Sequence, residues 1–212
     1  MKVDSAAYLR LINIGRALSA EKDIDSLLDR ISAEAKTMAN ADAGSLYLTV
    51  DDEVLSFVIV FNDRLNIAQG GNSGNPITLP DVPLRRASGE PNMSNIATRS
   101  ANSGEVIIID DLYQSKEFDS SGAKKFDELT GYESRSFLTL PLKDSKDKTL
   151  GILQLLNAKD EQDEVIAFPK DVVPLMEALA SQASLALENC HLLDEQVAVS
   201  YTHLTLPTKR IV

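Results

Sequence analysis

Few of the side chains that perform catalysis or bind metals occur in this sequence. Its 212 residues include one cysteine, Cys190, and two histidines, His191 and His203. One cysteine cannot form an internal disulfide or a Cys-x-x-Cys metal or redox pair, and two histidines leave little for zinc or for proton transfer near neutral pH. There is no Ser-His-Asp order and no His-Glu-x-x-His motif, and no carboxylate pair has a spacing that separates a general acid from a base. We therefore expect the chain not to be an enzyme.

Two other stretches contain residue types that bind ions in other proteins. Asp110-Asp111 begins an acidic loop, which we interpret as a hydrated loop and not as a metal site. Residues 70–75 consist of Gly and Asn with one Ser, but they lack the lysine of a phosphate-binding loop and do not open a helix. Because Gly and Asn tolerate positive φ, we predict an irregular loop at 62–76 around this cluster.

The composition is that of a globular protein with an acidic surface. Apolar residues make up 43% and charged residues 25% of the chain, and its length suits one domain of roughly 150 residues with flanking helices. The net charge of −11 argues against nucleic-acid binding, which requires a basic patch. No apolar run approaches the ~18 residues of a membrane span, and the N-terminus lacks a signal-peptide pattern. We expect a cytoplasmic protein without membrane insertion.

The periodicity of the apolar residues predicts helices at both ends and strands between them. We predict helices at 4–20, 23–38, 93–101, 121–129 and 171–196, and strands at 43–50, 54–61, 77–79, 105–109, 136–142 and 149–157. Asp23 is the expected N-cap of the second helix, although one continuous helix bent around residues 20–23 fits the pattern equally well.

Both terminal helices have apolar faces that need a covering surface. In the first helix the stripe is Tyr8, Leu11, Ile12, Gly15 and Leu18, which can pack on the domain's own sheet or on a partner subunit. In the last helix the main face is Val172, Met176, Leu179, Ala183, Ala186, Cys190 and Leu193, with Ala178, Leu185 and Leu192 beside it and Ser184 on the polar face. Because this apolar arc is too wide for one sheet contact, we predict a homodimer through the N- and C-terminal helices.

We divide the chain into an N-terminal helix at 1–22, one domain at 23–196 and a tail at 197–212. The last twelve residues, YTHLTLPTKRIV, are basic, β-prone and without periodicity. We interpret the tail as non-native or disordered and leave it out of the functional argument.

Several stretches of the chain resemble one family of regulatory domains. They are SGEVIIIDD at 103–111, TGYESRS at 130–136, LTLPLKD at 138–144, GILQLLNAKD at 151–160 and ALASQASLALEN at 178–189. Together they resemble GAF domains, in particular the regulatory GAF domains of cyclic-nucleotide phosphodiesterases, nucleotide cyclases and bacterial signalling proteins. The resemblance implies an α+β fold of the GAF/PAS type, with a central antiparallel sheet of about six strands and helices on both faces. One face would carry the terminal helices, and the other a pocket.

The resemblance also implies ligand-binding positions. They are Ser45, Phe61, Asn62, Ile96, Ala97, Asp127, Thr130, Ser134 and Gln154. Phe61 and Asn62 match a pair that reads a purine, and Ile96 and Ala97 match the start of a short helix whose backbone amides suit a phosphate. The others match polar positions on the sheet and around TGYESRS. Each position also has a plainer interpretation. Phe61 can belong to the core, Thr130 to a turn, and Asp127 can cap a helix. Ser45 and Gln154 can simply face solvent.

Family members that bind cyclic nucleotides commonly carry Asn-Lys followed by Phe and then Asp-Glu. Asn157, Phe168 and Asp171 match this signature, but Ala158 stands in place of the lysine unless Lys159 shifts in, and the final glutamate is absent. This departure weakens the case for a cyclic purine nucleotide as the bound cofactor.

We therefore predict a sensory GAF domain that binds a small ligand in a pocket and signals through its terminal helices to an output domain outside this sequence. Two alternatives stay open: a module specific for a cyclic nucleotide (cAMP or cGMP), and a structural dimerisation domain whose pocket is filled by its own side chains. Relatives that reduce methionine sulfoxide use paired cysteines, and bilin-binding relatives need a cysteine near the pocket. Cys190, on the last helix, fits neither chemistry.

Overall fold

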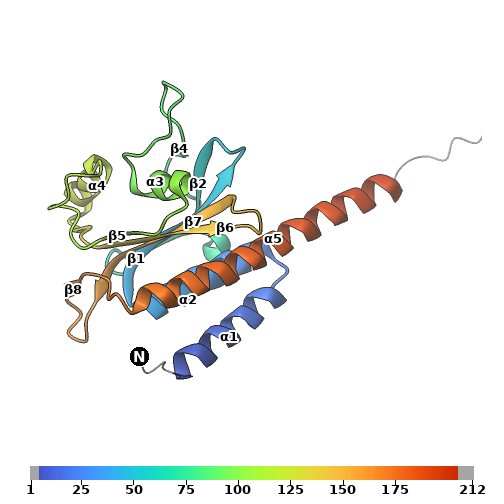
Figure 1. The fold of residues 1–212 in the computed structure, drawn as a ribbon, viewed down its shortest axis with the longest axis horizontal. Coiled ribbons are helices and arrows are strands. Elements are labelled where there is room, and N and C mark those ends of the chain that lie inside the picture. Colours follow the sequence, from blue (N-terminus) through green and yellow to red (C-terminus); the bar gives the residue numbers. More distant parts are fainter. Residues whose placement is uncertain (1–4, 205–212) are drawn as a thin grey trace, which may run out of the picture.

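The computed structural model describes residues 5–204 and, within them, the side chains of residues 9–190. Its helices are α1 (Ser5–Ala20), α2 (Ile24–Ala39), α3 (Ile96–Ser103), α4 (Ser121–Thr130) and α5 (Val172–Leu204), with a short 3-10 helix η1 (Gly71–Ser73). The strands are β1 (Ala41–Val50), β2 (Val54–Asn62), β3 (Ile67–Gly70), β4 (Val82–Pro83), β5 (Ile107–Ile109), β6 (Phe137–Lys143), β7 (Thr149–Lys159) and β8 (Val165–Ile166). Figure 1 shows the sheet between two sets of helices, with α1, α2 and α5 on one side and α3 and α4 on the other.

The strands form one antiparallel sheet in the order β3-β2-β1-β7-β6-β5. Strand β4 pairs with the start of β2, and β8 pairs with the end of β7. These two strands have only two residues each, so six longer strands make up the body of the sheet. The predicted α+β fold, an antiparallel sheet with helices on both faces, is confirmed.

Tight turns connect the longest neighbouring strands. Between β1 and β2, Asp51 and Asp52 have φ angles of 53° and 57°, in the left-handed region that Asp and Asn enter more readily than other side chains. Between β6 and β7, the Asp144 carboxylate accepts hydrogen bonds from the backbone N–H groups of Lys146 and Lys148, each at 2.8 Å. Both turns consist of residues that favour them locally, which agrees with the strands that the sequence predicts on either side of each turn.

Side chains along each strand alternate between the two faces of the sheet. In β7, Leu153 and Leu155 pack into the core under the helices, whereas Gln154 faces the opposite side. The register places Ser45 of β1 and Thr139 of β6 directly opposite Gln154. A row of polar side chains therefore crosses the face that the terminal helices do not cover.

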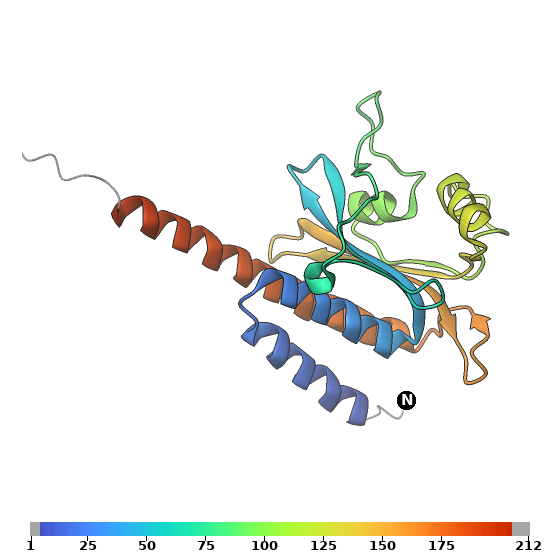
Figure 2. The same cartoon turned by 180° about the vertical axis from the view of Figure 1, so that it is seen from behind.

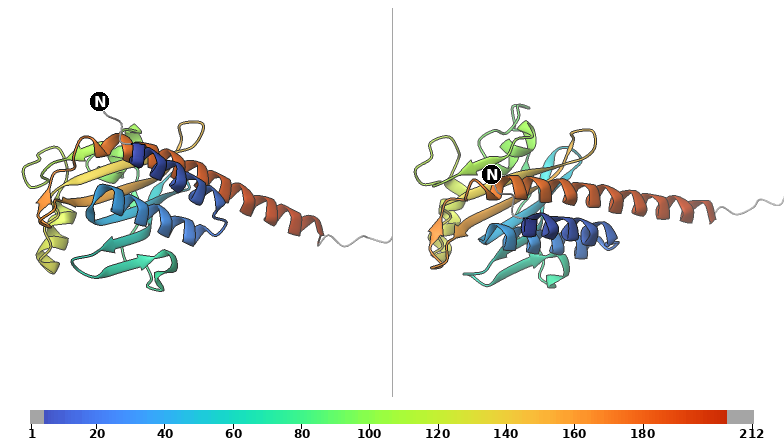
Figure 3. Two further views of the ribbon diagram at one scale, coloured as in Figure 1. Left: turned by 90° about the horizontal axis from the view of Figure 1, so that it is seen from below. Right: turned by 60° about the horizontal axis from the view of Figure 1, so that its bottom comes forward.

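Helices α2 and α5 cover the other face, and α1 packs mainly against α5 (Figures 1 and 3). Asp23 is the N-cap of α2 as predicted, since its carboxylate accepts a hydrogen bond from the Ser26 N–H at 2.9 Å. The alternative of one continuous bent helix is wrong, because α1 ends before this cap. Ile14 and Leu18 of α1 are buried, whereas Ile12, expected in the buried stripe, is 57% exposed.

Helix α5 buries the predicted apolar face over its described side chains. The fully buried members of this face are Met176, Leu179, Ala183, Ala186 and Cys190. Ser184, expected on the polar face, is also buried, and its hydroxyl donates to the Ala180 carbonyl at 2.9 Å. Another side of α5 faces α1 of the same chain, where a Cβ added to Gly15 would lie 2.6 Å from Gln182 Oε1. Leu185 stays 48% exposed, while Leu192 and Leu193 lie outside the described side chains.

The segment between β2 and α3 differs most from the prediction. Strand β3 lies in a predicted loop, and the strand expected at 77–79 is absent. The 3-10 helix η1 follows β3 and reaches α2, where the Asn72 N–H donates to the Asp29 carboxylate at 3.0 Å (Figure 2). Strand β3 forms because β2 offers it an edge, and pairing of this kind is not encoded in local propensity.

Helix α5 continues beyond the predicted end at residue 196 to Leu204. Figure 1 shows its C-terminal part projecting past the edge of the sheet. The remainder of the tail that we interpreted as non-native or disordered, residues 205–212, lies outside the described residues.

Candidate functional site

The sheet face opposite α2 and α5 carries a cavity of about 660 Å³, which we call the sheet cavity. Its floor is formed by β1, β2 and β7, and its walls by the segment between β3 and β4, the start of α3 and the first turns of α4. Of the nine expected ligand-binding residues, those that line it are Ser45, Phe61, Asn62, Ile96, Ser134 and Gln154. The other three, Ala97, Asp127 and Thr130, do not line it.

Hydrogen-bonded side chains cross the floor of the sheet cavity. Tyr47 Oη donates to Gln154 Oε1 at 3.2 Å, and Gln154 Nε2 donates to Thr139 Oγ1 at 3.1 Å. Burial raises the pKa of Tyr47, so its hydroxyl stays protonated and remains a donor. The Tyr47 ring also packs on Phe57, with the ring centroids 4.3 Å apart. Gln154 therefore faces the cavity and not solvent, but its amide is already engaged at both ends.

Phe61 and Asn62 end β2 at the side of the cavity. The Phe61 ring is half-buried and packs over Gly44 on the helix side of the sheet, where Lys36 Nζ of α2 lies 5.6 Å from its centroid. Asn62 is buried, and its Oδ1 accepts a hydrogen bond from the Leu65 N–H at 2.9 Å. The side-chain carbonyl of Asn62 thus stabilises the turn after β2, so less of this side chain is available to form hydrogen bonds with a ligand.

The start of α3 does not present the backbone amides that the resemblance implied. The side chain of Asn95, the N-cap of α3, accepts hydrogen bonds from the N–H groups of Ala97 at 2.9 Å and Thr98 at 3.2 Å. Ala97 packs into a small core with Leu55 and Ile152. The cap occupies the Ala97 N–H in this structure, so the geometry gives no support to a phosphate contact there.

Asp127 is a buried latch for α4 and not a cavity residue. Its carboxylate accepts hydrogen bonds from Tyr113 Oη at 2.6 Å and from the N–H and Oγ of Ser134, both at 2.8 Å. The hydrogen bond to Asp127 raises the pKa of Tyr113 to about 12. Thr130 is exposed at the end of α4, where its hydroxyl donates to the Phe126 carbonyl at 2.8 Å. Thr130 thus has the plainer role of a helix-end residue.

Sequence reasoning missed the aromatic side chains that line most of the sheet cavity. Tyr132 is the most telling, because its hydroxyl donates to buried Asp42 at 2.9 Å, and Asp42 in turn pairs with Lys159 at 3.3 Å. Burial, followed by the bond to Asp42, raises the pKa of Tyr132. Two signals were available: Tyr132 is the tyrosine of TGYESRS, and strand alternation places Tyr47 on the same face as Ser45.

Comparisons with known proteins identify the family. A family model described as the GAF domain matches residues 23–187, which is more than half of the chain. The chain belongs to the GAF family. GAF domains are regulatory or sensory modules, and the matched residues run from the N-cap of α2 into α5.

One curated relative of this GAF domain is the dual 3′,5′-cyclic-AMP and -GMP phosphodiesterase 11 of Drosophila melanogaster. The two are 29% identical over 146 residues, which cover 65% of this chain and 9% of that protein. The chain thus spans only a small part of the relative's length.

Solved GAF domains have the same fold. The GAF domain of a phosphoenolpyruvate-protein phosphotransferase from Coxiella burnetii gives a TM-score of 0.64 at 17% identity, covering 91% of this chain and 99% of that one. Its counterpart from Acinetobacter gives 0.61 at 16% identity, covering 90% and 97%.

The family signature after β7 takes a different form in this GAF domain. Asn157, at a φ of 55°, accepts hydrogen bonds from the N–H groups of Arg135 at 2.8 Å and Ser136 at 3.3 Å, and its Nδ2 donates to the Glu133 carbonyl at 2.7 Å. Lys159 pairs with Asp42 and Asp163, and not with the start of α5. Asn157 therefore ties β7 to the TGYESRS segment that leads into β6.

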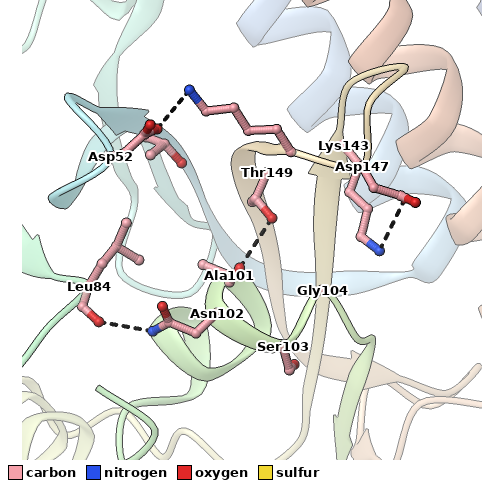
Figure 4. A pocket seen from close by; sticks show the side chains of 11 residues that line it. Asp52, Leu84, Ala101, Asn102, Ser103, Gly104, Lys143, Asp147 and Thr149 are labelled. Carbon is pink, nitrogen blue, oxygen red and sulfur yellow. Dashed lines mark hydrogen bonds and ion pairs between the residues drawn. The ribbon is translucent and has the colours of Figure 1, made fainter. Parts of the chain in front are cut away.

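A second hollow of about 530 Å³ lies between the end of α3 and the turns of the two hairpins (Figure 4). Lys148 pairs with Asp52 at 2.9 Å, and Lys143 with Asp147 at 3.8 Å. Thr149 Oγ1 donates to a carbonyl of α3 at 3.2 Å. Because each lysine already has a carboxylate partner on an exposed hairpin, we place the candidate site in the sheet cavity.

Two further findings concern the described part of the chain. Within it, no three His, Cys, Asp or Glu side chains lie close enough together to hold a metal ion. None of its helices combines the length and the apolar character needed to cross a membrane.

Proposed function

We propose that this GAF domain is a sensory module: the sheet cavity binds a small ligand, and α1 and α5 pass the change to an output domain in a longer protein. The observation that carries the proposal is the cavity itself. Its volume of about 660 Å³ falls within the range of roughly 300–1,000 Å³ that is typical of ligand pockets.

The strands under the cavity offer a route to the helices. In β7, Gln154 lines the cavity while its neighbours Leu153 and Leu155 pack under α2 and α5. In β1, Tyr47 lines the cavity and Leu46 lies in the same helix-side core. Because this core is close-packed, a ligand that shifts the floor of the cavity also shifts the surface on which the helices rest.

Gly122 allows the proposal to be tested by blocking the cavity without disturbing the fold. It lines the cavity in the first turn of α4, its φ is not left-handed, and a Cβ there would meet no atom within 4 Å. Gly122→Phe therefore adds a ring at the cavity, and replacing a helical glycine also favours the helix. Lys125→Phe, on the exposed side of the same helix, is the matched control.

The assay is a thermal-shift screen of small molecules against the three proteins. We expect compounds that raise the unfolding midpoint of the wild type and of Lys125→Phe but not of Gly122→Phe. The same compounds should slow hydrogen exchange in α5. If no compound separates the wild type from Gly122→Phe, the cavity is not a ligand site and the proposal fails.

We also propose a homodimer through the terminal helices. It is supported by three side chains that stay exposed on them, Leu9 at 63%, Ile12 at 57% and Leu185 at 48%. Light scattering at high protein concentration should give the mass of a dimer, and Ile12→Glu should give a monomer. Val50→Glu, exposed on the distant β1–β2 hairpin, is the control that should stay dimeric. A monomeric wild type would refute this part.

A cyclic nucleotide, cAMP or cGMP, is the second candidate ligand. Its support is the 29% identity to a segment of the Drosophila phosphodiesterase. Calorimetry with both nucleotides decides: heat that disappears in Gly122→Phe favours this candidate, and no heat with either leaves the generic sensor. We prefer both to a ligandless dimerisation domain, since the sheet cavity of about 660 Å³ is not filled by the protein's own side chains.

A further inference from the structure

The sheet cavity is strongly aromatic and has no positive charge. Five aromatic side chains point toward it, Tyr47, Phe57, Phe126, Tyr132 and Phe137. Phe61 also borders the cavity, but its ring packs over Gly44 on the helix side of the sheet. Among the described residues that line it, none is Lys, Arg or His, and Asp119 is the single charged side chain. Asp119 is exposed, so this carboxylate lies at the rim.

The polar side chains of the cavity are mostly hydrogen-bonded to other protein groups. The Gln154 amide is held between Tyr47 and Thr139, and the Tyr132 hydroxyl donates to Asp42. The Ser134 hydroxyl likewise donates to the Asp127 carboxylate. A ligand that needs many hydrogen bonds would have to break these, and each bond broken leaves a buried polar group unpaired.

Helix N-termini, which often hold anions, do not serve that purpose here. Asn95 caps α3, as described above. At α4, the Asp119 carboxylate accepts a hydrogen bond from the Ser121 N–H at 2.9 Å, so the protein's own carboxylate already stands where an anion would bind. Lys36 is paired to Asp63 and Arg99 to Glu117, and Lys124 of α4 lies over the Tyr113 ring outside the cavity lining.

We infer that the sheet cavity takes a flat, apolar ring compound that carries no phosphate or carboxylate, and that Asp119 at the rim favours a positively charged one. The inference rests on the proposed function, since it names the ligand class of the same site. Phe57 and Phe126 are only partly buried, so their rings offer stacking surface at the cavity, and aromatic ring faces attract cations. A buried anion would have no cation to compensate its lost hydration.

Three tricyclic probes of the same shape isolate the effect of charge: acridine, which is neutral at pH 7.5, 9-aminoacridine, a cation, and acridine-9-carboxylate, an anion. Adenosine and cAMP form a second pair that differs by the cyclic phosphate. We expect 9-aminoacridine to bind about two- to fivefold more tightly than acridine, because an exposed carboxylate contributes little. The carboxylate should bind at least about tenfold more weakly than acridine. cAMP should bind no better than adenosine, and Gly122→Phe should abolish the binding of all probes.

Asp119→Asn tests the role of the rim carboxylate. The asparagine Oδ1 can still accept from the Ser121 N–H, so the hydrogen bond at the start of α4 is kept while the charge is removed. The preference for the cation should disappear, and acridine itself should bind unchanged. Asp110→Asn, exposed and outside the cavity lining, should leave both affinities unchanged.

The outcomes separate this inference from the proposed function. Equal or tighter binding of acridine-9-carboxylate, or tighter binding of cAMP than of adenosine, would overturn the ligand class and leave the ligand pocket in place. The ligand class is also overturned, and the ligand pocket kept, if no acridine binds while another compound raises the unfolding midpoint of the wild type but not of Gly122→Phe. If nothing binds in either experiment, both the inference and the proposed function are wrong.

Discussion

Removing the Asp127 carboxylate should release α4 from the domain. Asp127 is the only residue of α4 that is fully buried, and the rest of the helix contacts the body through a few partly exposed side chains. Its carboxylate connects three groups on two other segments, Tyr113 Oη and the N–H and Oγ of Ser134. Asp127→Ala deletes this connection without adding bulk.

The loss of stability expected for Asp127→Ala follows from the hydrogen-bond donors that are left without an acceptor. Ser134 is only 3% exposed, and each of its two donors costs about 1–3 kcal/mol when left without an acceptor in the interior. Tyr113 is 44% exposed, so its hydroxyl can turn to water and adds little. The gain in helix propensity from Asp to Ala offsets about 0.5 kcal/mol. The two donors together cost about 2–6 kcal/mol, so the net loss is about 1.5–5.5 kcal/mol, which raises the opening equilibrium of α4 by roughly 10- to 10,000-fold.

Hydrogen exchange followed by mass spectrometry measures this opening directly. Exchange of peptides within residues 121–136 should speed up by that factor, while peptides of β1 and β7 stay protected. Glu128→Ala, the exposed neighbour on the same helix, is the control and should change exchange by less than about threefold. If Asp127→Ala also leaves the exchange of α4 within threefold of the wild type, the latch does not hold the helix and the reasoning is refuted.

Three further predictions concern the tyrosine, the clamp after β7 and the core. The pKa of Tyr113, measured by NMR of its ring carbon, should be about 12 against the usual 10.0, and it should return toward 10 in Asp127→Ala. Because the folded pKa is raised, the stability that this hydrogen bond contributes is present below pH 10 and is lost as the pH rises through 12. An unshifted tyrosine would contradict the bond. Asn157→Ala should lower the free energy of unfolding, measured in urea, by about 3–4 kcal/mol, because it removes three side-chain hydrogen bonds and places alanine at a φ of 55°. The loss in Asn157→Gly should be about 1 kcal/mol smaller, since glycine also lacks the three bonds but tolerates this φ. Equal losses would show that the backbone conformation is not strained. Leu153→Ala, at 0% exposure, should cost about 2–5 kcal/mol. Leu129→Ala, at 78% exposure, should cost less than about 0.5 kcal/mol, and similar values for the two would contradict the assignment of the core.

Elements whose signals are local could be predicted from the sequence. The β6–β7 hairpin follows from alternating apolar residues and a turn that Asp144 stabilises by itself, and the start of α2 follows from Asp23 as a cap. Ser45 and Gln154 were placed in the pocket through the family resemblance, and strand register put them side by side. The α+β fold class and the GAF family were likewise predicted through the family resemblance.

What only the tertiary structure decided depends on partners far apart in the chain. Strand β3 exists because β2 offers an edge, and Asp127 is a latch because Tyr113 and Ser134 converge on it. The Ala97 N–H is occupied because Asn95 caps the helix. The sequence by itself determined most of the longer strands and helices, since periodicity and capping act within a few residues. The structure decided which polar groups are already paired and which charges surround the cavity, because pairing and burial depend on distances that no local pattern records.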